Sequence, residues 1–420
     1  MKVLWIINSP IGPIARKLKM QSASGTWLTA ALKEVECNEI ELYIVCCIQG
    51  SDNITIQSNN ITYIAIGGNA PTEYIVNSDS IKSWETLYHR IEPDLIHIWG
   101  TEYPHSLAAL KGKPESIPAL IYVQGVMKSV SDNYYGGLDK TTLIKYTSII
   151  ERITKKSIFD SKKRIENSEK NETEEINLAN GIIYETTWSK NYYKSINKSM
   201  SCYYHRLPIE GIFRGYSWNV DGYIPHRIFT PASDYPLKGV HFLIQAVAIL
   251  KNSYPDITLI IPGARVTKDL SLSEKLKQKA YRKYLRHLIT KNDLWDNIEF
   301  PGILTPVQMA ENMRDANIFV CSSTIENHSS TLREAMLVGT PCITTNVGGI
   351  PEYFIDNEDG LMYSPYDVDA LVNRITKMFT ERSIAESFSD SAKKHIIEYY
   401  DSPSPKLMEI YNKFLSSFTT

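Results

Sequence analysis

The sequence predicts an α/β protein built from two doubly wound units. Short β-rich runs recur along the chain and alternate with helical or polar stretches, a pattern typical of largely parallel sheets. The 420 residues are 43% hydrophobic, enough to bury at least two ordinary cores. We expect one unit over residues 1–219 and a second over 220–395. In residues 396–420 a Ser-Pro-Ser-Pro break interrupts the helical pattern, so we expect this segment to leave the second unit.

Each expected unit repeats the same alternation of strand and helix. The first opens with an apolar strand over residues 3–7, and its later β-rich runs are ELYIVCCI, ITYIAI, LIHIW and ALIYVQG. The second opens with HRIFTPA, followed by the amphipathic helix GVHFLIQAVAILKNSY and the runs ITLIIPG, NIEFPG and NIFVCSS. Both units therefore fit a doubly wound α/β architecture.

Charge and cysteine content exclude several classes of protein. The net charge of −2 comes from 45 basic and 47 acidic residues, so no overall field attracts nucleic acid. The six cysteines lack Cys-x-x-Cys spacing for zinc or redox chemistry, and buried thiols in a reducing compartment are the simplest explanation. The first apolar run is far shorter than a signal-peptide core, and no window reaches transmembrane length. We therefore expect a cytoplasmic protein.

Residues 151–164 are unusually basic. They hold six Lys or Arg side chains against Glu151 and Asp160, interleaved with apolar residues. A basic amphipathic helix of this kind can lie on an anionic membrane surface. Because the acidic run ENSEKNETEEIN follows directly, a solvated helix face is the preferred interpretation. Peripheral contact with the inner face of the membrane is kept as a second hypothesis.

The most informative stretch is CSSTIENHSSTLREAMLVGTPCITTNVGGIPE, over residues 321–352. It predicts a strand, a polar loop, a short helix that begins near Ser330 or Thr331, a second strand and a glycine turn. Free N–H groups at the start of that helix suit an anionic ligand such as a diphosphate. Thr331 and Glu334 alone also fit a capping box, in which the glutamate only satisfies a backbone amide. The surrounding polar loop, Glu326 and the glycines favour a ligand site.

This stretch resembles the nucleotide-sugar-binding signature of retaining glycosyltransferases of family 4. Glu326 and Glu334 stand as its E-x7-E pair, and Ala335, Met336, Gly339 and Pro341 follow in the expected order. The second unit also carries a Lys-Gly step and strand-end glycines like those of the family. First-unit matches are weaker and comprise the loop Ser24-Gly25-Thr26-Trp27 and residues 98–105. The resemblance implies the GT-B fold: two Rossmann-like domains, the first on the acceptor side, facing an interdomain cleft, with the C-terminal helix packing back on the first.

The resemblance also implies roles for individual residues. Lys238 would pair with the donor diphosphate, Glu326 would contact sugar hydroxyls and Glu334 the ribose hydroxyls. Ser233 occupies the place of an arginine common in the family, so a second cation must come from elsewhere, with Arg265 the best-placed candidate. The candidate catalytic residues are Lys238, Glu326 and His105, and the candidate donor-binding residues are Gly25, Ser233, Lys238, Gly263, Arg265, Gly302, Glu326, Asn327, Ser329, Ser330, Thr331, Leu332 and Glu334.

Two histidines in the first unit invite opposite interpretations. Many family members place a histidine two residues after the position of His97, where this chain has Trp99. Core packing is the preferred interpretation for His97. For His105, an active-site role and a structural role are weighed equally.

No metal site is expected. Asp367 and Asp369 fit the Asp-x-Asp string of metal-dependent transferases, but they also fit the start of a helix, which is the preferred interpretation. The expected function is metal-independent and cofactor-free transfer of a sugar, with retention, from a nucleoside diphosphate sugar to a saccharide or lipid-linked acceptor in cell-surface polysaccharide synthesis. UDP is favoured over GDP as the donor nucleotide. A sugar-nucleotide epimerase and a non-catalytic sugar-nucleotide-binding subunit are the alternatives.

Overall fold

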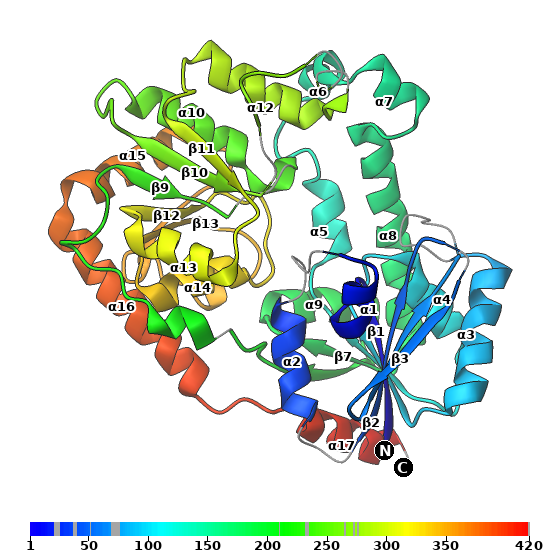
Figure 1. Cartoon of the computed structure of the whole chain (residues 1–420). Coiled ribbons are helices and arrows are strands. Elements are labelled where there is room, and N and C mark those ends of the chain that lie inside the picture. The colour runs from blue at the N-terminus through cyan, green and yellow to red at the C-terminus, as the bar shows by residue number, and fades with distance from the viewer. Residues whose placement is uncertain are drawn as a thin grey trace. The chain divides into compact units, whose positions relative to one another are not determined.

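The chain forms two α/β units in a computed structural model (Figure 1). The structure describes residues 1–20, 26–36, 40–50, 52–68, 76–209, 211–231, 235–263, 266–271, 274 and 277–418. Unit 1 comprises Met1–Ser131, Lys163–Glu210 and Pro403–Thr420. Unit 2 comprises Asp132–Lys162 and Gly211–Ser402.

Unit 1 contains an eight-stranded sheet in the order β3-β4-β2-β1-β5-β6-β7-β8, parallel except for the antiparallel pair β3 and β4. Its strands are β1 (Lys2–Ile7), β2 (Glu41–Cys47), β3 (Ile54–Ser58), β4 (Ile61–Ile66), β5 (Leu95–Trp99), β6 (Ala119–Tyr122), β7 (Gly181–Tyr184) and β8 (Ser201–Tyr204). Its helices are α1 (Gly12–Lys17), α2 (Thr26–Glu36), α3 (Ser78–Ile91), α4 (Pro104–Gly112), α5 (Met127–Asp132), α8 (Ile158–Leu178), α9 (Thr187–Ile196) and α17 (Leu407–Phe418).

Unit 2 contains a six-stranded parallel sheet in the order β11-β10-β9-β12-β13-β14. Its strands are β9 (Arg227–Phe229), β10 (Thr258–Pro262), β11 (Ile298–Gly302), β12 (Ile318–Cys321), β13 (Cys342–Thr345) and β14 (Gly360–Tyr363). Its helices are α6 (Lys140–Tyr146), α7 (Ile149–Ile153), α10 (Val240–Leu250), α12 (Ala280–Lys291), α13 (Pro306–Asp315), α14 (Ser330–Val338), α15 (Val368–Thr380) and α16 (Arg382–Asp401), with 3₁₀ turns η1 (Gly211–Gly215), η2 (Pro236–Lys238) and η3 (Ile350–Glu352).

Both sheets reverse their winding direction beside their first strand. In unit 1 the chain runs from β1 to β2 on one side and later places β5 on the other. In unit 2 it runs from β9 to β10 on one side and later places β12 on the other. The carboxyl ends of such strand pairs form a topological switch point, where open α/β sheets hold their ligands. The topology therefore marks one ligand-binding position in each unit.

The central strand of unit 1 is buried on both faces. Val3, Trp5 and Ile7 pack into one core, and Leu4 and Ile6 pack into another on the opposite face of the sheet. All five side chains are at most 1% exposed. This explains why β1 reads as a continuous apolar run and not as an alternating one.

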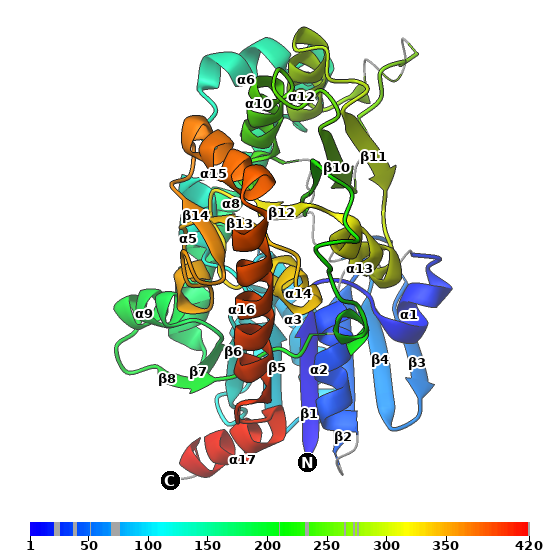
Figure 2. The same ribbon diagram turned by 90° about the vertical axis from the view of Figure 1, so that its left-hand side faces the viewer.

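The last helix, α17, packs on unit 1, as expected. The Trp5 indole donates a hydrogen bond of 3.0 Å to the buried Tyr411 hydroxyl, which also contacts the ring of His97. His97 is fully buried, in agreement with its predicted core role. The crossing back begins later than predicted, because residues 396–401 still belong to α16, which packs against α14 in unit 2 (Figure 2). The chain leaves α16 at Ser402, just before Pro403.

The units differ from the predicted boundaries in one long segment. Residues 132–162 were expected within the first unit but cluster with unit 2. The Tyr146 ring packs edge-on against Tyr284 of α12, with ring centroids 5.5 Å apart. The Glu151 carboxylate accepts a hydrogen bond of 3.0 Å from the Ala280 backbone N–H at the start of the same helix. These tertiary contacts have no counterpart in the local sequence pattern.

The basic segment 151–164 is not one helix, so the expectation of a continuous amphipathic helix is wrong. Helix α7 ends at Ile153, and Lys155 takes a left-handed conformation with φ of 51°. A new cap then starts α8, where the Ser157 backbone N–H donates to the Asp160 carboxylate at 3.0 Å. Among the described residues, no helix combines the length and apolar character needed to span a bilayer.

Candidate functional site

The polar loop of residues 322–329 joins β12 to α14 at the switch point of unit 2. Ser329 is the N-cap of α14, and its side chain accepts a hydrogen bond from the Leu332 N–H at 3.5 Å. Because Ser329 is the cap, Thr331 and Glu334 do not form the capping box that their spacing allowed. Glu334 instead lies half-buried in the second turn. The competing structural interpretation of this glutamate is thereby removed.

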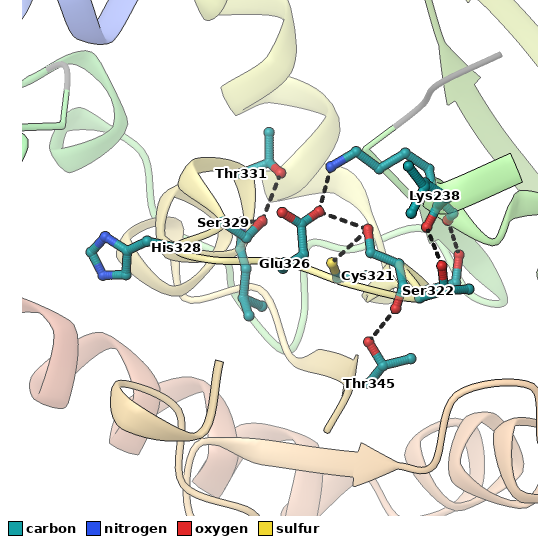
Figure 3. A network of polar contacts seen from close by, with 12 residues as sticks. Lys238, Cys321, Ser322, Glu326, His328, Ser329, Thr331 and Thr345 are labelled. Atoms are coloured by element: carbon teal, nitrogen blue, oxygen red, sulfur yellow. Dashed lines mark hydrogen bonds and ion pairs between the residues drawn. The ribbon is translucent and has the colours of Figure 1, made fainter. Parts of the chain in front are cut away.

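Lys238 and Glu326 form an ion pair across the switch point. Lys238 ends η2, in the connection that follows β9, and its ammonium contacts Glu326 Oε1 in the loop after β12 (Figure 3). The Ser323 hydroxyl donates to the same carboxylate oxygen at 2.7 Å. The predicted pair of functional residues is therefore assembled from positions 88 residues apart in sequence.

Glycines allow the backbone segments of this site to approach closely. Gly239 has φ of 65°, and a Cβ atom on it would lie 1.9 Å from the Ser322 carbonyl oxygen. Gly348 has φ of 56°, and a Cβ atom there would lie 1.8 Å from the Glu326 carbonyl oxygen. Any larger residue would clash with backbone at either position. The Lys-Gly step and the glycine turn thus have a steric reason in addition to the family resemblance.

Three hydrogen bonds to η2 and β13 fix the loop that carries Glu326. The Ser322 hydroxyl donates to the Lys238 carbonyl at 2.9 Å, and the Thr324 N–H donates to the Leu237 carbonyl at 2.7 Å. From β13, the Thr345 hydroxyl donates to the Ser323 carbonyl at 2.6 Å (Figure 3). The polar groups are therefore held in place before a ligand binds.

The ion pair keeps Lys238 charged despite partial burial. The Lys238 side chain is 26% exposed and that of Glu326 is 13% exposed. Burial lowers the pKa of Lys238, but the adjacent Glu326 carboxylate raises it, and the net pKa lies above the ordinary value for lysine. The site thus presents a permanent ammonium ion that a diphosphate can contact and a carboxylate that can accept hydrogen bonds from hydroxyl groups.

A buried arginine lies behind the start of α14, and sequence reasoning did not identify it. Arg333 is 1% exposed and donates from Nε to the Ser329 carbonyl at 3.4 Å and from a terminal nitrogen to the Ser330 hydroxyl at 3.3 Å. Its other terminal nitrogen contacts the Tyr400 hydroxyl of α16. Its position inside the E-x7-E span was a usable signal, since an arginine is rarely buried without a specific role. It adds a fixed positive charge next to the helix N-terminus.

The remaining predicted donor residues fall into three groups. The first group lies at or just before the start of α14, where Asn327, Ser329 and Leu332 are buried and Ser330 and Thr331 are half-buried. Gly263 and Gly302 meet at the ends of β10 and β11, where the Gly263 N–H donates to the Gly302 carbonyl at 2.7 Å. Gly25, Ser233 and Arg265 lie outside the described residues.

The switch point of unit 1 carries a second polar cluster. Asn8 follows β1 and donates from Nδ2 to Glu102 Oε2, after β5, at 2.7 Å. The Asn8 Oδ1 atom is buried and has no hydrogen-bond partner among the described residues. Burial raises the pKa of Glu102, against the opposing hydrogen bonds from its own backbone and from Asn8. This cluster was not predicted from sequence.

His105 belongs to the same region of unit 1. It lies in the first turn of α4, is 4% exposed, and stacks on Tyr103 with ring centroids 5.9 Å apart. Burial lowers the pKa of His105 to about 4, against an opposing contribution from the Ile7 backbone. The imidazole is therefore neutral at pH 7, which suits a hydrogen-bonding role better than a cationic one.

Asp367 is a helix cap, as the preferred interpretation predicted. It is the N-cap of α15, and its carboxylate accepts a hydrogen bond of 2.8 Å from the Ala370 N–H. Asp369 follows in the first helical turn, where a negative charge is favourable. The Asp-x-Asp string therefore has a structural explanation.

Comparison with known proteins gives a family match in the second half of the chain. Residues 225–395 match the family model described as glycosyl transferases group 1. Over this region, which is less than half of the chain, the protein is similar to group 1 glycosyltransferases. The matched region includes Lys238, Glu326 and Glu334 and excludes His105, and the match confirms the resemblance to family 4 glycosyltransferases.

Two curated relatives illustrate how far this similarity extends. The putative glycosyltransferase YtcC of Bacillus subtilis is 30% identical over 163 residues, which cover 38% of each chain. The capsular polysaccharide biosynthesis glycosyltransferase CapM of Staphylococcus aureus is 26% identical over 180 residues, which cover 42% of this chain and 43% of the relative. The match thus spans less than half the length of these relatives.

Solved structures match the whole chain by fold. Anabaena HepE, solved in complex with UDP and glucose, has a TM-score of 0.67 and 16% sequence identity and covers 100% of both chains. Sucrose-phosphate synthase from Thermosynechococcus elongatus has a TM-score of 0.66 and 16% identity and covers 100% of this chain and 97% of its own. The predicted GT-B fold is confirmed.

Proposed function

We propose that this protein is a metal-independent, retaining glycosyltransferase that uses a nucleoside diphosphate sugar as donor. The observation that carries the proposal is the Lys238–Glu326 network, which faces the N-terminus of α14 inside the region that matches group 1 glycosyltransferases. The network pairs a cation suited to a diphosphate with a carboxylate suited to a sugar hydroxyl. Neither an epimerase nor a binding subunit gains support from a specific contact.

In the proposed mechanism the donor is bound before the bond breaks. Lys238 and the free N–H groups of the first turn of α14 bind the diphosphate, Glu326 accepts a hydrogen bond from the sugar, and Glu334 accepts hydrogen bonds from the ribose. Arg333 acts as a positioning residue, because it holds the Ser329 carbonyl and the Ser330 side chain at the helix start.

The chemical step exchanges one bond to the anomeric carbon for another. The acceptor oxygen forms a bond to this carbon on the face from which the diphosphate leaves, and the bond to the diphosphate oxygen breaks. The acceptor proton passes to the departing diphosphate, whose growing negative charge Lys238 stabilises. Attack on the same face retains the configuration.

On the acceptor side, we assign hydrogen-bonding roles to Glu102 and His105 of unit 1. The buried neutral imidazole and the half-buried carboxylate lie by the switch point of their own sheet and complement a ligand with several hydroxyl groups. A saccharide or lipid-linked saccharide has this chemistry.

Support for the finer assignments comes from the similar proteins. HepE was solved with UDP, which favours UDP over GDP as donor nucleotide, and CapM is named for capsular polysaccharide biosynthesis, which favours cell-surface polysaccharide synthesis. For an acceptor of this kind we propose that the enzyme acts in the cytoplasm at the inner face of the membrane.

A transfer assay tests the function. Wild type is incubated in EDTA with UDP-, GDP- and ADP-linked sugars and mixed saccharide acceptors, and the anomeric configuration of each product is determined by proton NMR. We expect a glycoside with the donor's configuration. An inverted product would overturn retention, and an epimerised nucleotide sugar formed without acceptor would overturn the transferase assignment.

A further inference from the structure

Helices α6 and α7 expose an unusual group of isoleucines. We name residues 140–156 the 140–156 surface; they comprise α6, α7 and the turn after it (Figure 1). Ile144 is 50% exposed, Ile149 74%, Ile150 48% and Ile153 76%. Single exposed apolar residues are common on proteins, but a cluster of large ones marks a contact surface.

Contacts on the inner side of α7 explain why these isoleucines point outward. Glu151 is buried, and its carboxylate accepts hydrogen bonds from the Ser148 hydroxyl at 2.8 Å and from the Ala280 N–H at 3.0 Å. Lys283 of α12 lies 3.5 Å from the same carboxylate. Because these contacts of Glu151 hold one side of α7 against α12, Ile149 and Ile153 lie on the exposed side.

Glu151 is also the only acidic residue in this stretch. Residues 140–156 contain five basic side chains, all on exposed residues: Lys140, Lys145, Arg152, Lys155 and Lys156. The single carboxylate is turned inward and is paired with Lys283. The outward side of residues 140–156 is therefore apolar and mostly positively charged, and one exposed acid, Asp139, flanks it as the N-cap of α6.

The acidic run further along the chain does not neutralise the positive charge of the 140–156 surface. The turn at Lys155, with φ of 51°, ends the α7 region, and the acidic residues follow on the separate helix α8. The sequence-based preference for a solvated face rested on the acidic run that follows directly, and the structure places that run on a separate helix.

We propose that the 140–156 surface docks onto an anionic lipid bilayer. The isoleucines would enter the headgroup and acyl-chain boundary while the ammonium and guanidinium groups contact lipid phosphates. A bilayer fits this surface better than a folded partner does, because its five exposed basic residues outnumber the one flanking acid, Asp139, and a bilayer does not need a complementary shape. The proposal rests on the proposed function, because an enzyme bound to the bilayer would meet a lipid-linked acceptor there. Membrane binding can nevertheless be tested without turnover.

Vesicle flotation gives a direct test with the full chain. Wild type is mixed with phosphatidylcholine vesicles or with mixed phosphatidylcholine and phosphatidylglycerol vesicles, at low and high salt. We expect binding to the anionic vesicles at low salt, weak binding to neutral ones, and a loss of affinity at high salt. Ile149→Ser combined with Ile153→Ser should weaken binding at least about tenfold, and Lys156→Gln about fivefold.

Matched controls distinguish vesicle binding through the 140–156 surface from nonspecific binding. Ile303, 63% exposed elsewhere in unit 2, is replaced as Ile303→Ser, and Lys394, with its side chain 78% exposed, as Lys394→Gln. Both should bind vesicles like wild type. Circular dichroism and UDP binding should be unchanged in every variant, since the replaced side chains are exposed.

Three outcomes would overturn the membrane assignment. The first is absence of binding to anionic vesicles. The second is binding that the isoleucine pair and Ile303→Ser reduce equally. The third is a wild-type dimer that the isoleucine pair converts to monomer without any vesicle binding, which would make the surface a contact between copies. Absence of UDP binding by wild type would instead contradict the proposed function, whereas the vesicle-binding result would remain valid.

Discussion

The two switch points of this molecule have the same topology but different electrostatics. In unit 2, Lys238 follows the first strand and pairs with Glu326 across the reversal of the sheet. In unit 1, Asn8 follows the first strand and pairs with Glu102 in the equivalent place. One pair joins two ions, whereas the other joins an amide to a carboxylate whose pKa burial raises.

The difference indicates how one architecture can serve two kinds of ligand. A permanent ammonium beside a helix N-terminus suits a diphosphate that gains charge. A cluster without a cation, with the neutral His105 nearby, suits an uncharged hydroxyl-bearing ligand. The following predictions test this division, beginning with the largest effect.

Replacing Lys238 should abolish most activity. Lys238→Ala removes the cation that stabilises the leaving diphosphate and leaves the Glu326 carboxylate without its ion-pair partner. We expect kcat/KM to fall about 10²–10³-fold, measured by transfer from the preferred donor. The control is Lys251→Ala, which removes a lysine that pairs with Asp293 on the surface of the same unit. Equal losses in both variants would contradict a specific role for Lys238.

The stability of the protein should depend on pH, because unit 1 buries a carboxyl group that is neutral in the folded state. Burial raises the pKa of Glu172 to about 8, against opposing hydrogen bonds from Thr101, Tyr193 and the Met127 N–H, and Glu102 raises it further. The pKa of Glu172 in the folded protein exceeds its ordinary value, so the protonated carboxyl group stabilises the folded state. This stabilisation is fully present below about pH 4.5 and is lost as pH rises to about 8.

The associated change in the free energy of unfolding between pH 5 and pH 9 is on the order of 4 kcal/mol. Urea unfolding of wild type between pH 5 and pH 9 should show it, and Glu172→Gln should flatten the profile. The control is Glu174→Gln, which alters an exposed acid that pairs with Lys111 at 2.8 Å. A wild-type profile that Glu172→Gln leaves unchanged would show that Glu172 does not titrate in this way.

Glu102 should affect the acceptor and not the donor. Glu102→Gln keeps the shape of the side chain but weakens a charged acceptor, so we expect the KM for acceptor to rise about tenfold while UDP affinity stays constant. Gly100→Ala should act in the same way, because a Cβ atom there would lie 2.2 Å from Glu102 Oε2 and displace the carboxylate. A change in donor affinity alone would contradict the assignment of the acceptor to unit 1 and the donor to unit 2.

The smallest effect should come from Asp367. Asp367→Ala removes the cap of α15 and should lower the free energy of unfolding by about 1 kcal/mol. UDP binding in EDTA should not change, and added Mn²⁺ or Mg²⁺ should not strengthen it in wild type. Metal-dependent binding that Asp367→Ala abolishes would contradict the cap interpretation.

Sequence reasoning succeeded where the information is local. Glu326, Ser329 and Glu334 occur within one strand, loop and helix, so their spacing alone predicted a helix N-terminus flanked by carboxylates. The position of Lys238 followed from the Lys-Gly step, whose steric reason is the contact between Gly239 and the Ser322 carbonyl. The two-unit α/β fold followed from buried strands that read as apolar runs.

Sequence reasoning failed where contacts join distant segments. Asn8 and Glu102 are 94 residues apart, and their pairing depends on β1 lying beside β5. Arg333 and Tyr400 are 67 residues apart, and their contact depends on the packing of α16 on α14. The assignment of residues 132–162 to unit 2 likewise rests on tertiary contacts with α12. Periodicity carries no information about such neighbours.

Isothermal titration calorimetry with UDP in EDTA tests the central claim most directly. Wild type, Lys238→Ala, Glu334→Ala and Glu102→Gln are titrated under the same conditions. The Lys238–Glu326 assignment predicts selective binding by wild type, loss of binding in Lys238→Ala and Glu334→Ala, and unchanged binding in Glu102→Gln. Unchanged UDP affinity in Lys238→Ala would contradict the assignment of the donor site to the switch point of unit 2.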